Sequence, residues 1–317
     1  MLAIADLPGW LVTGVVLALG LTLGSFLNVV IHRLPRGESL IRPGSRCPHC
    51  GKRIRAYDNL PLLSFALLRG RARCCGARIS VRYPLIELIG ALLCWAIFRI
   101  LIESEGAQVA LTRAALLFAL YSALGLGLVA AAFIDLEHMF LPDEITLGGS
   151  LLGFASAGYR LEVGWRESLF GAALGFLMIW LPFDVGYRAL RGHSGMGLGD
   201  AKLTMLAGAW FGWVGAVFTL LAGAVQGTVV AITLLLVRGK LEEPEAVRRE
   251  RAERLEQIQN APESERARLL LEHEQDPLAK EPEPGIGKAR IAFGPFLAVA
   301  LLEYMLFGRF VLEGTFL

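Results

Sequence analysis

The stretch KLTMLAGAWFGWVGAVFTLLAGAVQGTVVAITLLLV, residues 202–237, contains no charged residue after its first position. It is 36 residues long, whereas one helical membrane crossing needs about 20 apolar residues. We therefore predict two consecutive spans that form a helical hairpin, with its turn near FGWVG at 211–215. Within a bilayer each helix satisfies its own backbone hydrogen bonds, so this run predicts a helical membrane protein.

Other apolar runs precede and follow this hairpin. They bring the predicted number of transmembrane helices to about eight, with the further spans at 10–31, 85–102, 110–134, 144–158, 168–187 and 291–310. The chain is 55% apolar and its mean hydropathy is +0.54, which excludes an ordinary soluble domain. The predicted fold class is an all-α polytopic membrane protein. Glycines four residues apart, which let helices approach closely in lipid, occur at 20/24, 149/153 and 171/175.

Charged residues gather in two segments between these spans. Residues 32–84 hold 12 Lys/Arg and 2 Asp/Glu, and residues 238–290 hold 11 and 13, so together they carry 38 of the 60 charges. Because basic residues collect on the cytoplasmic side of a membrane, we expect both segments to lie there. The predicted parts are a first transmembrane helix (1–31), a cytoplasmic Cys-rich loop domain (32–84), a membrane core (85–237), a charged cytoplasmic insertion (238–290) and a last transmembrane helix (291–317).

The charged insertion alternates Glu and Arg. Pairs such as Glu245/Arg249 and Glu250/Arg254 have the spacing of neighbours on a helix. Its apolar residues are too sparse for a hydrophobic core. We interpret it as a solvated helix or helical hairpin, and a regulatory domain is the alternative.

Four cysteines of the Cys-rich loop domain suit a structural metal. Cys47-Pro-His-Cys50 presents two thiols on one turn, and Cys74 and Cys75 supply two more. Four thiolates in a tetrahedral arrangement form a common zinc site. The second pair is adjacent in sequence instead of spaced as C-x-x-C, and His49 is a competing ligand. Reduced thiols without a metal are the alternative, since disulfides are rare in the cytoplasm.

Two acidic residues at the ends of apolar runs are candidates for catalysis. Asp135 follows the run 110–134, and Asp200 follows Gly197-Leu-Gly199, a backbone free to bend close to a substrate. An ionisable group at membrane depth is costly and indicates function. Two such acids can share a proton and activate water. Since Asp135 ends one helix and Asp200 begins another, the helix dipoles predict that Asp135 is the acid and Asp200 the base.

Three further carboxylates have simpler interpretations. Asp143 precedes a span, which is typical of a helix N-cap. Asp184 and Glu87 lie near cytoplasmic helix ends, where we expect them to pair with arginines.

Seven short motifs occur in order across nearly the whole chain. They are GSFLNVVIHRLP (24–35), CPHC (47–50), NLPLLS (59–64), ISVRYPLIE (79–87), DLEHMFLPD (135–143), GMGLGD (195–200) and FGP (293–295). This combination resembles the type IV prepilin peptidases. These GxGD-type membrane aspartic proteases are the bifunctional leader peptidase/N-methyltransferases of bacterial pilus and type II secretion systems.

The resemblance implies that Asp135 and Asp200 match the two catalytic aspartates, and that residues 32–84 form a cytoplasmic loop with four cysteines, for which the cysteine pattern itself predicts a structural zinc ion. It implies an aspartic endopeptidase of the bacterial inner (cytoplasmic) membrane that cleaves the basic leader of prepilins or pseudopilins at the cytoplasmic face. Methylation of the new N-terminus with S-adenosylmethionine is the implied second activity. The expected partners are these substrates and the lipid bilayer, and no nucleic acid.

Three features depart from the family pattern. A second C-x-x-C would place a cysteine at Ala72, so either Cys74 has taken over that ligand role or the site is incomplete. Ser194 stands where the family usually has Glu, which puts methylation in more doubt than cleavage. The 238–290 insertion is longer than the family pattern leads us to expect.

These departures leave other functions open. A peptidase that has lost methylation is the first alternative. A transporter whose acids carry protons or ions is the second, although such acids are expected near the bilayer centre and not at its edge. A zinc-dependent membrane scaffold without catalysis is the third.

Overall fold

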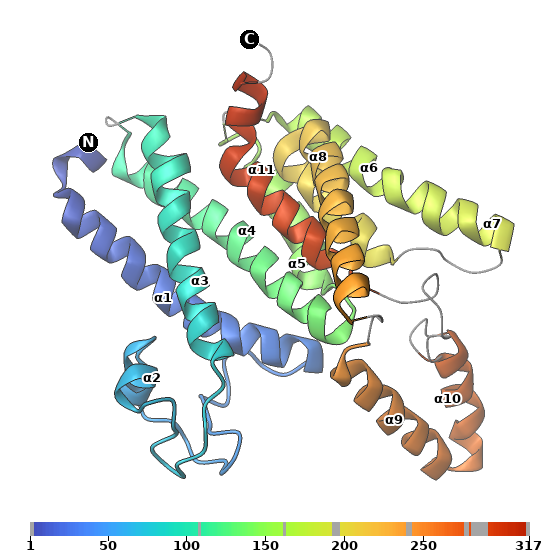
Figure 1. Cartoon of the computed structure of the whole chain (residues 1–317). Coiled ribbons are helices and arrows are strands. Elements are labelled where there is room, and N and C mark those ends of the chain that lie inside the picture. Colours follow the sequence, from blue (N-terminus) through green and yellow to red (C-terminus); the bar gives the residue numbers. More distant parts are fainter. Residues whose placement is uncertain are drawn as a thin grey trace. The chain divides into compact units, whose positions relative to one another are not determined.

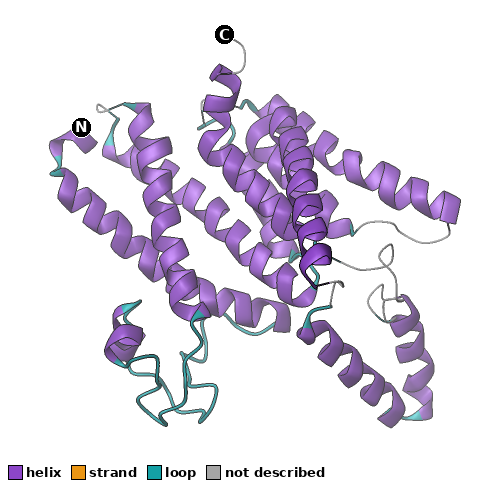
Figure 2. Ribbon diagram, in the orientation of Figure 1, coloured by secondary structure: helices purple, strands orange, loops and turns teal. Residues whose placement is uncertain are grey.

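The computed structural model describes residues 3–106, 109–160, 163–191, 197–238, 243–275, 279 and 291–314. Every regular element in these ranges is helical, and the only strand pairing among them is three isolated bridges (Figure 2). The predicted all-α fold is therefore confirmed. The chain divides into two compact units: Met1–Ala130 with Leu151–Trp165 and Leu302–Leu317, and Ala131–Ser150 with Arg166–Leu301.

Five helices of the described chain are long and apolar enough to cross a membrane. They are α1 (Gly9–Arg33), α3 (Arg82–Ala96) with the π-helical turn Ile97–Ile102, α4 (Leu111–His138), α6 (Trp165–Ile179) with the π-helical turn Trp180–Gly186, and α8 (Leu198–Arg238). Two further helices carry the remaining apolar runs, α5 (Asp143–Ser156) and α11 (Gly294–Gly314). The eight apolar runs predicted from the sequence fall on these seven helices, since α8 contains two of the runs.

The long helix α8 reverses direction at its middle. Phe211 (φ −128°) and Gly212 (φ 68°) are non-helical. Thr204 lies before this break and Ala216 after it, yet both lie beside Gly175 of α6. A Cβ atom built on Gly175 would contact the Thr204 carbonyl and lie 3.2 Å from the Ala216 Cβ. A straight helix would separate residues 204 and 216 by about 18 Å. The hairpin turn therefore lies within the predicted stretch 211–215.

Close glycine contacts join helix pairs within each unit, as the four-residue spacing predicted. In the first unit α1 crosses α3, and a Cβ built on Gly90 would lie 2.7 Å from the Gly24 Cα (Figure 1). In the second unit, Gly171 of α6 meets Gly208 and Gly212 of α8 at backbone contact distance. Side chains at these positions would force the helices apart, so the glycines set the helix spacing.

The Cys-rich loop domain lies between α1 and α3 and contains little helix. Its helical turns are Leu34–Arg36, Ala56–Asn59 and α2 (Leu63–Leu67). Leu62, which has a positive φ of 58°, donates its backbone N–H to Glu87 Oε2 at 2.8 Å. Glu87 therefore ties this loop to α3 through a backbone group, where the sequence suggested an arginine partner.

The charged insertion forms two helices, α9 (Glu245–Asn260) and α10 (Glu263–Gln275). The predicted ion pair between Glu245 and Arg249 is present at 2.5 Å. Most residues of α9 are exposed, as expected of a solvated helix, but Val247 and Ile258 are only 2% and 5% exposed. The sparse apolar residues of α9 share one face, which is enough to dock a mostly charged helix.

Candidate active site and candidate metal centre

Asp135 lies one turn before the end of α4 and is 5% exposed. The helix ends three residues later, because Met139 adopts a left-handed conformation (φ 55°). The carboxylate of Asp135 accepts a hydrogen bond from the backbone N–H of Gly294, the first residue of α11. A Cβ built on Gly294 would lie 2.7 Å from Asp135 Oδ2. Only glycine leaves room for this approach.

Asp200 lies in the first turn of α8 and is 9% exposed. Thr204, one turn later, donates its hydroxyl to the Asp200 carbonyl at 3.1 Å and to the Gly175 carbonyl of α6 at 2.8 Å. A Cβ built on Gly197 would lie 3.6 Å from Asp200 Oδ2. The start of α8 is thus fixed against α6, and the backbone before it passes close to the carboxylate.

The turn between α4 and α5 brings the two aspartates together. Leu141 in this turn is buried, and its side chain lies 3.1 Å from a Cβ built on Gly199 and 3.0 Å from one built on Gly294. Asp135 and Asp200 are close enough to interact electrostatically. Both carboxyl groups are also shielded from water, with Asp135 5% and Asp200 9% exposed.

The helix ends do not separate the roles of the two acids as the sequence suggested. Asp135 is at the C-terminal end of α4, but it also faces the N-terminal end of α11 through the Gly294 N–H. Both carboxylates therefore lie at a helix N-terminus, which removes the difference on which the assignment of acid and base depended.

Other charged residues near the site have structural partners. Asp143 is the first residue of α5 instead of its N-cap, and its Oδ1 lies 2.6 Å from Lys202 Nζ on α8. Lys202 is the single charged residue of the otherwise uncharged stretch 202–237, and the ion pair with Asp143 explains why a charge is present there. Asp184 lies half-buried in the π-helical turn after α6. Ser194 lies outside the described residues.

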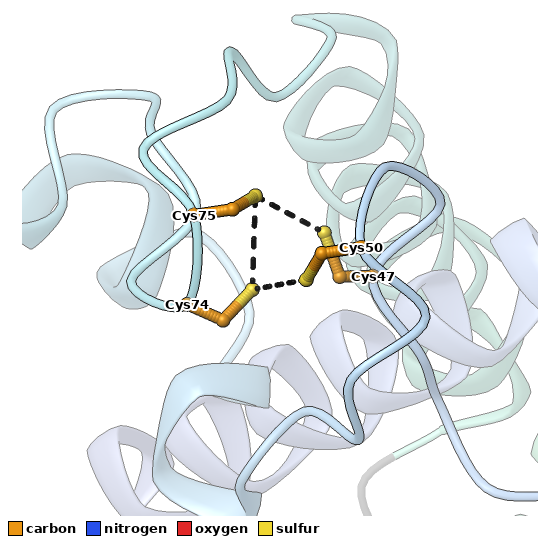
Figure 3. A group of neighbouring side chains, drawn as sticks. All are labelled: Cys47, Cys50, Cys74 and Cys75. Carbon is orange, nitrogen blue, oxygen red and sulfur yellow. Dashed lines mark hydrogen bonds between the residues drawn. The ribbon is translucent and has the colours of Figure 1, made fainter.

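The four cysteines of the loop domain converge, as Figure 3 shows. Their sulfur atoms all lie within 4.8 Å of one another, with Cys47–Cys75 at 3.7 Å, Cys50–Cys74 at 3.3 Å and Cys74–Cys75 at 3.9 Å. Four Zn–S bonds of about 2.3 Å in a tetrahedron would place the sulfur atoms about 3.8 Å apart. The cluster therefore fits a tetrahedral metal ion.

Two similar loops supply the four thiols. In each, an antiparallel bridge closes the loop, Arg46 with Arg53 and Arg71 with Arg78. When the two loops are aligned by their bridges, Ala72 of the second loop corresponds to Cys47 of the first, and Cys74 corresponds to His49. Cys74 nevertheless points its sulfur into the cluster (Figure 3). The structure thus places Cys74 where it can replace the cysteine missing at position 72.

The thiols of the cluster differ in acidity. Backbone N–H groups of Cys50 and His49 stabilise the thiolate of Cys47 and lower its pKa to about 6. The hydrogen bond with Cys50, together with burial, raises the pKa of Cys74 to about 12. Cys47 is therefore ionised at neutral pH and is the first sulfur available to a cation.

Two protein-family models match the chain in the regions that contain these two sites. The chain matches the family model described as "Bacterial Peptidase A24 N-terminal domain" over residues 18–101, and the "Type IV leader peptidase family" over residues 122–232. The first match contains all four clustered cysteines and the second contains both aspartates.

Individual relatives are identical to the chain at more than a third of the aligned positions. The prepilin leader peptidase/N-methyltransferase of Myxococcus xanthus is 39% identical over 239 residues, which cover 74% of this chain and 68% of the relative. That of Aeromonas hydrophila is 39% identical over 261 residues, covering 72% and 83%. That of Pseudomonas aeruginosa is 36% identical over 221 residues, covering 62% and 71%. No solved structure matches. The chain belongs to the prepilin leader peptidase/N-methyltransferase family.

Proposed function

We propose that this protein is a membrane aspartic endopeptidase that removes the basic leader from type IV prepilins or type II secretion pseudopilins. We propose that it then methylates the new N-terminal amine with S-adenosylmethionine. The observation that carries the proposal is the meeting of Asp135 and Asp200 between the ends of α4, α8 and α11. Family membership supplies the class of substrate.

The two aspartates can perform both proton transfers of peptide hydrolysis. One carboxylate takes a proton from water while the water oxygen attacks the scissile carbonyl carbon, and the other carboxyl group protonates the carbonyl oxygen. Collapse of the resulting diol breaks the C–N bond: the carboxyl group that took the water proton passes it to the leaving nitrogen, and the other carboxylate takes a proton back from a diol hydroxyl. The burial of both side chains strengthens these interactions by excluding bulk water.

Cleavage of a purified prepilin, followed by mass spectrometry, tests the proposed function. With the enzyme alone we expect loss of the leader mass, and with added S-adenosylmethionine a further 14 Da on the mature chain, about the mass of one CH₂ group. No leader removal under either condition would contradict the proposal. Cleavage without the added mass would favour the peptidase that has lost methylation, the alternative that Ser194 suggested.

We propose that both activities face the cytoplasm from the bacterial inner membrane. The +10 balance of residues 32–84 supports this orientation. A membrane-impermeant thiol reagent added to intact cells should label a Gly164→Cys variant, while Ser45→Cys and Asn260→Cys should react only after the membrane is opened. Labelling of Ser45→Cys from outside would reverse the orientation.

We also propose that Cys47, Cys50, Cys74 and Cys75 hold one structural zinc ion that organises residues 32–84 as a separate module. The sulfur spacing supports this assignment, and zinc supplies much of the folding free energy of such small loops.

Removal of one ligand should release the metal. We expect about one zinc per chain in the purified protein and much less in Cys74→Ser, because three thiolates hold zinc more weakly than four. Cys94→Ser is the matched control, since Cys94 is buried in α3 beside Ser122 and should leave the zinc content unchanged. Elemental analysis measures both. Equal zinc in Cys74→Ser and the unmodified protein would show that Cys74 is not a ligand.

A further inference from the structure

The charged insertion contacts the end of the helix that carries Asp135. His138, the last residue of α4, is 5% exposed. Its Nδ1 atom lies 2.7 Å from Oε1 of Glu250, which belongs to α9. These residues are 112 positions apart in the chain, so the contact links two segments that are distant in sequence.

Only one of the two imidazole nitrogens of His138 makes a hydrogen bond among the described residues. Nε2 is buried and makes no hydrogen bond among the described residues, although Glu137 Oε2 lies 3.9 Å away. The 2.7 Å contact with Glu250 is the hydrogen bond that fixes the orientation of the ring. A buried histidine with a single hydrogen bond depends on that bond for its position.

Glu250 reaches His138 from a docked helix. Val247, Glu250, Arg251 and Ile258 lie at helix-neighbour spacing on α9, and three of the four are almost fully buried. The side chain of Arg251 is 8% exposed and forms a bidentate ion pair with Glu243, at 2.9 and 3.0 Å. Glu250 lies at the margin of this face, with its side chain 56% exposed.

The end of α4 controls the geometry between the two aspartates. His138 immediately precedes the left-handed Met139, and Leu141, two residues further, packs against Gly199 and Gly294. Gly199 adjoins Asp200, and Gly294 donates its N–H to Asp135. A shift of His138 would therefore reach both carboxylates through this turn.

We propose that Glu250 is a positioning residue of the peptidase, which holds His138 and thereby the turn that sets the spacing of Asp135 and Asp200. The charged insertion is then part of the working enzyme. This inference rests on the proposed peptidase function, and it assigns Glu250 no contact with the substrate.

The test compares Glu250→Ala and Glu250→Gln with Glu253→Ala in a prepilin cleavage assay. Glu253 is exposed on the same helix and makes a matched control. We expect Glu250→Ala to lower kcat about tenfold with little change in KM, from the loss of one charge-assisted hydrogen bond. Glu250→Gln keeps an acceptor oxygen and should recover most of the rate. Glu253→Ala should match the unmodified enzyme.

Two further measurements separate positioning from loss of structure. The double variant of Glu250→Ala and His138→Ala should cleave no more slowly than His138→Ala alone, because Glu250 acts through the His138 ring. If the two residues acted independently, their losses of rate would multiply. Trypsin should cleave α9 at Arg251 no faster in Glu250→Ala, because Val247 and Ile258 still dock the helix.

The possible failures are distinguishable. If the unmodified protein cleaves no prepilin, the proposed function itself is wrong. If it cleaves, three results would each overturn the role of Glu250: equal rates for Glu250→Ala and Glu253→Ala, multiplying losses in the double variant, or rapid trypsin cleavage of α9 in Glu250→Ala.

Discussion

Replacement of Asp135 or Asp200 by asparagine should reduce prepilin cleavage about 10³-fold or more, because asparagine keeps the size of the side chain and cannot transfer a proton. Both side chains are buried, so bulk water cannot take over the proton transfer that either aspartate would lose. Each variant should still insert into the membrane and retain the zinc content of the unmodified protein. Mass spectrometry of the prepilin gives the rate.

Two other aspartates provide controls for this experiment. Asp184→Asn should keep a rate close to normal, since Asp184 lies in the π-helical turn after α6. Asp143→Asn loses the ion pair with Lys202. The Asp143 side chain is 55% exposed, so this loss should lower the rate about threefold or less. A near-normal rate for Asp135→Asn or Asp200→Asn would rule out the aspartic-protease mechanism.

Gly294→Ala should lower the cleavage rate about 100-fold, the effect expected when a reacting group is displaced by about 1 Å. The new Cβ would lie 2.7 Å from Asp135 Oδ2 and 3.0 Å from Leu141 side-chain atoms. Both contacts are too short, so the carboxylate and the turn must move. The hydrogen bond from the Gly294 N–H to Asp135 would be strained at the same time.

Gly148→Ala is the matched control for Gly294→Ala. Gly148 lies within α5, and a Cβ built there meets nothing within 4 Å. Alanine favours helix over glycine by up to about 1 kcal/mol, so this variant should be at least as stable as the unmodified protein and equally active. Thermal unfolding in detergent measures stability for both variants. Normal activity of Gly294→Ala would show that the close approach to Asp135 is unimportant.

The sequence predicted those features that depend on neighbouring residues. A run of 36 residues with one terminal charge is too long for one crossing, and the break at Phe211 and Gly212 follows from it. Glycines four residues apart predicted the close contacts of α1 with α3 and of α6 with α8. The four cysteines were also identifiable as one cluster, because few other arrangements bring four thiols together in a loop of this size.

Features that depend on tertiary packing could not be predicted in the same way. The contact of Gly294 with Asp135 joins α11 to α4 across more than 150 residues, and no local pattern encodes it. The burial of Val247 and Ile258 on one face of α9 could not be predicted either, because two apolar residues among many charged ones are equally compatible with a fully exposed helix. The position of the Cys74 sulfur within the cluster could not be predicted either, since the sequence does not show which way a side chain points.

The contact between Gly294 and Asp135 also has a consequence for the order of biosynthesis. Gly294 comes 94 positions after Asp200, with the charged insertion between them. At typical translation rates this interval takes on the order of ten seconds. During that time the nascent chain carries both aspartates but lacks the α11 backbone group that holds Asp135. Proteolytic competence should therefore arise only after residue 294 has been synthesised, well after both aspartates are present in the chain.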